Sequence, residues 1–278
     1  MKLYVSADME GTAGVCSWKQ CDPSNSLEYP LYRRYMTQEV RAAVDGAREG
    51  GARTILINDS HWDMRNLLFD ELPGDDDVRV ISGTRKPLSM GQGLDTSFHA
   101  AFFTGYHAGA GDAATLSHTY SPDTIYQVSI NGTQCSEALL HAALAGSYGV
   151  PVVLITGDDV VVRETLRRLP WAAGVVVKRA IGYTAVDSQT PQAAQAAIRA
   201  GAREAIGRIA AAKPFVFEAP FQLTIETANV ENADYMELLP RFERTGGRSV
   251  RFVSSDYPTV LRAFIVATRI GAAANVIV

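Results

Sequence analysis

Short runs of β-branched and other apolar residues alternate along most of the chain with longer segments whose apolar residues recur at helical spacing. Such alternation is typical of proteins in which helices cover both faces of a mainly parallel sheet. The sequence therefore predicts an α/β fold with three layers, α/β/α. The expected strands cover residues 3–6, 54–57, 78–81, 100–103, 125–130, 152–155 and 175–177.

The pattern of the sequence changes after residue 212. Up to that point helices and strands alternate, and the last helix begins at Thr190 and Pro191, which suit its N-cap and first turn. Beyond it lie strand-like runs at 215–218, 223–226 and 250–253, followed by a helix over about 258–269. We therefore predict an α/β domain over residues 1–212 and a smaller C-terminal α+β lobe over residues 213–278.

Composition excludes several classes of protein. The 278 residues are 47% hydrophobic and 20% charged, which is typical of a globular chain. Lys and Arg number 26 against 30 Asp and Glu, with no basic block, which argues against a nucleic-acid partner. Three cysteines are too few for a disulfide scaffold and the N-terminal apolar stretch is too short for a signal peptide, so we expect a cytoplasmic protein. No apolar run is long enough to cross a membrane.

Two carboxylates stand close together where the first expected strand ends, in Asp8-Met9-Glu10-Gly11. If the extended backbone continues through these residues, the side chains of Asp8 and Glu10 project to the same face. Two neighbouring carboxylates repel each other unless a cation lies between them or one of them stays protonated. Such a pair alone belongs more often to a solvated loop or a helix cap, so it indicates a metal site only together with further ligands.

Two of the five histidines, His61 and His107, follow directly after expected strands. The carboxyl ends of parallel strands carry the ligand-binding loops of α/β sheets, so both histidines are expected at one edge. Glu137 falls at the start of a predicted helix. With Asp8 and Glu10, these side chains offer the oxygen and nitrogen ligands that zinc or manganese prefers, and they suffice for two ions if one carboxylate bridges. The domain over residues 1–212 is therefore the predicted metal-binding domain.

His118 lies in a loop rich in Gly and Ala, eleven residues after His107. It is either an ordinary turn histidine or a catalytic group beside the metal ions that does not ligate them. The residues alone leave both interpretations open.

Six short motifs follow one another along the chain. They are Asp8-Met9-Glu10-Gly11, Asn58-Asp59-Ser60-His61, Lys86-Pro87-Leu88-Ser89-Met90, Gly105-Tyr106-His107-Ala108, Ser117-His118 and Gly157-Asp158-Asp159. Each motif alone is weak, but the ordered set is highly specific. It closely resembles the zinc-dependent D-aminopeptidases of the dipeptide-transport-protein A (DppA) type, and the resemblance covers the chain nearly end to end.

The resemblance implies a metal-dependent aminopeptidase that hydrolyses the N-terminal bond of short peptides, especially those containing D-amino acids such as D-Ala. It also implies a homodecamer built from two stacked five-membered rings. His118 matches the residue proposed as the nucleophile of that family, although proton transfer is a physically less demanding role for an imidazole. Two zinc ions per subunit would be held, with the first residue bridging, by Asp8, Glu10, His61, His107 and Glu137.

Two other functions stay open at this point. Clustered Asp, Glu and His ligands also serve dinuclear metal phosphohydrolases, although Arg85 and Lys86 are the only basic pair close to the motifs. The third possibility is a non-catalytic accessory protein that binds peptides or metal. Turnover of D-Ala-D-Ala, and its loss on chelation, would separate these three functions.

Overall fold

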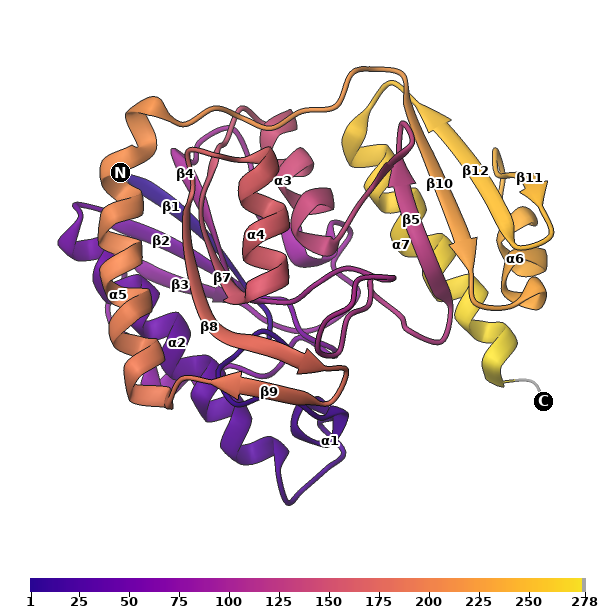
Figure 1. Ribbon diagram of the computed structural model, residues 1–278. Coiled ribbons are helices and arrows are strands. Elements are labelled where there is room, and N and C mark those ends of the chain that lie inside the picture. Colours follow the sequence, from indigo (N-terminus) through magenta and orange to yellow (C-terminus); the bar gives the residue numbers. More distant parts are fainter. Residues whose placement is uncertain (277–278) are drawn as a thin grey trace.

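A single sheet of seven strands forms the centre of the larger part of the molecule (Figure 1). The computed structural model describes residues 1–276. The strands are β1 (Lys2–Ala7), β2 (Thr54–Asp59), β3 (Val78–Ile81), β4 (Ala100–Tyr106), β7 (Val152–Asp158), β8 (Ala173–Gly182) and β9 (Ala185–Ser188). Their order is β3-β2-β1-β4-β7-β8-β9, and all neighbours are parallel except β8 and β9. The predicted mainly parallel sheet is confirmed.

Both faces of this sheet are covered by helices, namely α2 (Tyr29–Glu49), α3 (Glu137–Ser147), α4 (Asp159–Arg168) and α5 (Pro191–Arg208). The side chains of β1 alternate between two apolar clusters, as the pleat of a strand requires. Leu3 and Val5 pack in the cluster that contains α2 and α5, whereas Tyr4 packs in the cluster that contains α3 and the apolar side of α4. The predicted three-layer α/β/α arrangement is confirmed.

A second, antiparallel sheet lies beside the first and carries two helices (Figure 1). Its order is β11-β12-β10-β5-β6. The elements are β5 (Ile125–Ile130), β6 (Thr133–Gln134), β10 (Phe221–Thr227), α6 (Val230–Glu237), β11 (Glu243–Gly246), β12 (Ser249–Ser254) and α7 (Tyr257–Ala272). The smaller α+β lobe thus exists, but its sheet takes β5 and β6 from before residue 212 and β10 to β12 from after it. A domain boundary at residue 212 stays a prediction.

The strand predicted at residues 215–218 is wrong, because this segment forms no strand. Its aromatic side chains pack instead of pairing in a ladder: Phe215 and Phe217 contact each other edge to face, and Phe217 stacks on Tyr257 of α7. Strand propensity mostly measures how well a side chain fits a half-buried surface, so alternating aromatic residues also suit an extended segment that lies on a core.

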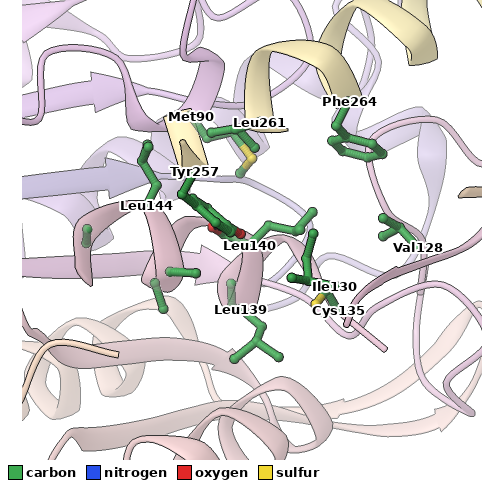
Figure 2. Close-up of a cluster of buried hydrophobic side chains, with 14 of the residues drawn as sticks. Met90, Val128, Ile130, Cys135, Leu139, Leu140, Leu144, Tyr257, Leu261 and Phe264 are labelled. Atoms are coloured by element: carbon green, nitrogen blue, oxygen red, sulfur yellow. The ribbon is translucent and has the colours of Figure 1, made fainter. Parts of the chain in front are cut away.

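The two sheets are joined by apolar packing between α3 and α7. Figure 2 shows part of this cluster, with Tyr257 of α7 directed at Leu140 of α3, and the Tyr257 hydroxyl donates to the Leu140 carbonyl at 3.0 Å. Leu144, Leu261 and other buried side chains complete the cluster. Each large apolar side chain that is fully buried contributes about 1.5–3 kcal/mol, so this seam holds α3 against the smaller lobe.

The remaining elements are short. They are α1 (Trp18–Cys21), η1 (Phe69–Glu71), η2 (Ser89–Gly91), η3 (Ile209–Ala211) and η4 (Ala273–Val276). Two of them, η3 and η4, directly continue α5 and α7. Within residues 1–276, none of the helices has the length and hydropathy needed to cross a bilayer.

Candidate metal centre

The five side chains predicted as ligands lie together at one edge of the main sheet, lining a cavity of about 470 Å³. Their exposed fractions lie between 1% and 4%. They come from the chain just after β1, β2 and β4 and from the first turn of α3. Parallel strands end at the same edge, which explains why side chains distant in sequence meet here. The five residues are Asp8, Glu10, His61, His107 and Glu137.

The loop after β1 is held tightly against β4, and this contact aims its carboxylates. The backbone N–H of Asp8 donates to Thr104 O at 2.9 Å, and that of Gly11 donates to Gly105 O at 2.8 Å. A Cβ atom at Gly11 would lie only 1.8 Å from Tyr106 O, so this position accepts no larger residue without a shift of the backbone.

Asp8 lies at the middle of the cluster. Its Oδ1 is 3.4 Å from Nδ1 of His61, and its Oδ2 is 3.4 Å from Nε2 of His107. Glu10 Oε2 lies 2.9 Å from the same His61 nitrogen, and Glu137 Oε1 lies 3.7 Å from the same His107 nitrogen. The centre therefore has two halves, each with one histidine and one glutamate, and Asp8 contacts both halves through different oxygens.

The three histidines of the cavity are oriented by backbone carbonyls. His61 Nε2 lies 2.8 Å from Cys21 O, His107 Nδ1 lies 2.9 Å from Ala108 O, and His118 Nδ1 lies 2.8 Å from Leu116 O. A carbonyl oxygen only accepts, so each of these nitrogens carries a proton. The other nitrogen of His61 and of His107 points at the carboxylates, and it would ligate a metal ion after losing any proton that it carries, which is how metal-ligating histidines are commonly held.

Two buried atoms of the cluster lack a hydrogen bond within the described part of the chain, namely Asp8 Oδ2 and His107 Nε2. Buried polar atoms are nearly always satisfied, so such a pair needs an explanation. A divalent cation supplies one, because carboxylate oxygens and imidazole nitrogens are ligands that zinc prefers. Ligand atoms of Asp8, Glu10 and His107 all lie within 4.8 Å of one another, as do those of His107, His118 and Glu137.

The pKa values of the carboxylates show that positive charge stabilises this cluster. Burial, and after it the Glu10 carboxylate, raises the pKa of Asp8 to about 7. Burial also opposes the charged form of Glu10, but His61, together with His107 and His118, outweighs it and holds the pKa of Glu10 well below its usual range. Three buried carboxylates in one site are costly without compensating charge, and divalent cations supply it.

His118 lies beside the two halves of the centre. Its ring stacks on His107 with 4.1 Å between the ring centroids, and Trp18 packs edge-on against its ring. Its Nε2 is 3.9 Å from an oxygen of Glu10 and equally far from one of Glu137, too far for hydrogen bonds. Burial, followed by His107, lowers the pKa of His118 and favours the neutral ring, the form that accepts a proton.

Lys178 is a site residue that the sequence analysis missed. It is 1% exposed in β8, and its ammonium group donates to the backbone carbonyls of Glu10 and Val15, the latter at 2.7 Å. It thus holds both ends of the loop that carries the carboxylates. A signal was present, because a lysine directly after the apolar run at 175–177 is unusual in a buried strand.

A further acidic residue of this edge, Asp158, supports the backbone around the centre. Asp158 is the N-cap of α4, and its Oδ1 accepts hydrogen bonds from the backbone of Val160 and Val161. Its other oxygen accepts from the N–H of Ala108 at 2.9 Å, which supports the loop after His107.

The opposite wall of the cavity comes from the smaller lobe. Four residues of α7 face the cavity, namely Ile265, Thr268, Arg269 and Ala272. Trp62, which is 51% exposed, lines it from the loop after β2. The cavity is therefore formed jointly by the main sheet and the smaller lobe.

Comparison with known proteins agrees with this geometry. Residues 1–266 match peptidase family M55, described as D-aminopeptidase. A D-aminopeptidase of Bacillus subtilis (strain 168) is 34% identical over 273 residues, which is 97% of each chain. A solved structure described as the Zn-dependent D-aminopeptidase DppA from Bacillus subtilis, a self-compartmentalizing protease, is similar with a TM-score of 0.93 and 33% identity over 98% of each chain. The chain belongs to the M55 family of D-aminopeptidases.

Proposed function

We propose that this protein is a zinc-dependent aminopeptidase that removes the N-terminal D-amino acid from short peptides. The observation that carries the proposal is the buried cluster in which Asp8 contacts two histidines through different oxygens. Family membership supports the reaction, and the description of the similar DppA structure supports the metal.

We propose further that each subunit holds two zinc ions. His61 and Glu10 would hold one ion, His107 and Glu137 would hold the other, and Asp8 would bridge them. Two divalent cations would offset the charge of these three buried carboxylates, which the neighbouring histidines also stabilise. When bound, zinc supplies a Lewis acid that polarises the scissile carbonyl and lowers the pKa of water toward about 7.

His118 would transfer protons in this reaction. Its Nδ1–H is fixed by the Leu116 carbonyl, so its Nε2 faces the cavity and can take a proton from the attacking group. The same imidazolium then gives a proton to the leaving nitrogen as the C–N bond breaks. Direct attack of His118 on the carbonyl is the other role that the resemblance implies.

The function is tested by incubating zinc-loaded protein with D-Ala-D-Ala, L-Ala-L-Ala and p-nitrophenyl phosphate. We expect release of D-alanine from the first compound, loss of this activity with a chelator and its return with zinc. Hydrolysis of the phosphate ester alone would instead identify a phosphohydrolase. Tight binding of the peptide without turnover would identify an accessory protein.

We expect Lys178→Met to weaken zinc binding about 10–100-fold, because it removes the support of the loop that carries Glu10. Zinc affinity is measured by competition with a chromophoric chelator, and thermal melting checks that the variant is folded. Lys213→Met, which removes an exposed lysine outside the cavity, is the matched control. Unchanged affinity in folded Lys178→Met would show that the loop needs no such support.

The assembly and location of the protein are part of the same proposal. The similar DppA structure is described as self-compartmentalizing, and we propose that this chain also forms a decamer of two five-membered rings. We propose a cytoplasmic location, which agrees with three cysteines that are all free.

A further inference from the structure

The charge of the cavity is very uneven. Five of the side chains that line it are carboxylates, namely Asp8, Glu10, Asp22, Asp123 and Glu137. Among the described residues that line the cavity, Arg269 is the only lysine or arginine. It projects from the last turn of α7, on the wall that the smaller lobe contributes.

Arg269 has no partner of its own within residues 1–276: no other residue there receives a side-chain hydrogen bond from it or forms an ion pair with it. Some exposed arginines outside the cavity are paired, as Arg48 is with Asp75 and Arg199 with Glu49. Others in the described chain, such as Arg262, form no ion pair, but among them Arg269 is the one that faces the carboxylates of the cavity. A guanidinium presents its N–H donors in a planar fork that matches a carboxylate. An unpaired fork in an acidic cavity is therefore suited to an anionic ligand.

The position of Arg269 relative to the metal centre is fixed by Tyr120. The backbone N–H of Tyr120 donates to Glu137 Oε1 at 2.6 Å, and its ring packs edge-on against Phe264 of α7 with 5.0 Å between centroids. These contacts hold α7, and with it Arg269, against the part of the cavity wall that contains Glu137. One peptide residue spans at most about 3.6 Å, so a short peptide can extend from the centre toward this wall.

A short peptide carries an ammonium group at one end and a carboxylate at the other. The carboxylates of the cavity favour the ammonium group and repel the C-terminal carboxylate, which needs a cation away from the metal centre. We propose that Arg269 binds the C-terminal carboxylate of the substrate and so selects short peptides with a free C-terminus over peptide amides. This inference rests on the proposed function, because it concerns the peptide that the aminopeptidase cleaves.

The test compares D-Ala-D-Ala with D-alanyl-D-alaninamide, which lacks the charged C-terminus, in the wild-type protein and in Arg269→Gln. Loss of one charged contact is expected to lower kcat/KM for the free peptide about 10–100-fold, mainly through KM. The ratio of kcat/KM for the free peptide to that for the amide should fall by nearly the same factor. Zinc content and melting temperature show whether the variant is intact.

Arg262→Gln is the matched control, because Arg262 is an exposed residue of the same helix that does not line the cavity. It should leave the ratio unchanged. An equal loss for both compounds in Arg269→Gln, or no loss for the free peptide, would overturn the inference. Absence of hydrolysis by the wild-type protein would instead contradict the proposed function. Calorimetric binding of the two compounds to the zinc-loaded proteins would then test Arg269 alone, with equal affinities overturning its role.

Discussion

Replacement of Asp8 by Asn is expected to abolish hydrolysis of D-Ala-D-Ala and to lower zinc affinity more than about 100-fold. Loss of a residue that only hydrogen-bonds a metal ligand already lowers affinity by up to about 100-fold, and Asp8 is itself a proposed ligand. Asn keeps the shape of Asp but has one oxygen, so an NH₂ group would face one of the two histidines that Asp8 contacts. Zinc per chain is measured by elemental analysis and activity by release of D-alanine.

The same variant should not be less stable than the wild-type protein when both are stripped of metal. Burial raises the pKa of Asp8 to about 7, above its usual value, so its charged form destabilises the fold at neutral pH and above. Asn removes that charge, and we expect an equal or higher melting temperature after chelator treatment. Asp187→Asn, at an exposed position of β9, is the control. Full zinc content and activity in Asp8→Asn would remove Asp8 from the centre.

His118→Ala is expected to lower kcat about 10²–10⁴-fold and to leave zinc content unchanged, because in the proposed mechanism the imidazole transfers protons and lies beside the five proposed ligands. His99→Ala is the control, since His99 is exposed at the entrance of β4 and accepts a hydrogen bond from the N–H of Lys2. Normal activity of His118→Ala would exclude a catalytic role. Mass-spectrometric detection of acylated His118 in the wild-type protein would assign it direct attack on the carbonyl.

The larger sheet could be predicted because the relevant signals are local. Apolar runs that end in His61 or His107 indicate parallel strands with a polar edge, and the same rule places Asp8 there. Glu137 could be placed in a first helical turn because Ser136 before it is a good N-cap, and its hydroxyl accepts from Leu139 N–H at 3.3 Å.

The smaller lobe was harder to predict because its contacts are distant in sequence. The run at 125–130 is plainly a strand, but its register opposite β10, with Ile130 beside Leu223, depends on residues about ninety positions later. The aromatic residues at 215 and 217 led to a strand being predicted where none forms. Their side chains are buried by packing on each other and on α7, as they would be in a sheet. The position of Arg269 in the cavity could not be predicted either, because nothing near it in the sequence indicates that this turn of α7 faces the cavity.

The path of the chain through the second sheet sets the order in which the protein can mature on the ribosome. The hairpin of β5 and β6 separates His118 from Glu137, yet the strand that covers its edge, β10, is synthesised only after α5 is complete. Until then the nascent chain exposes an unpaired edge and lacks the wall that α7 provides. The cavity around the candidate metal centre is therefore complete only after α7 has been synthesised and has packed in its place.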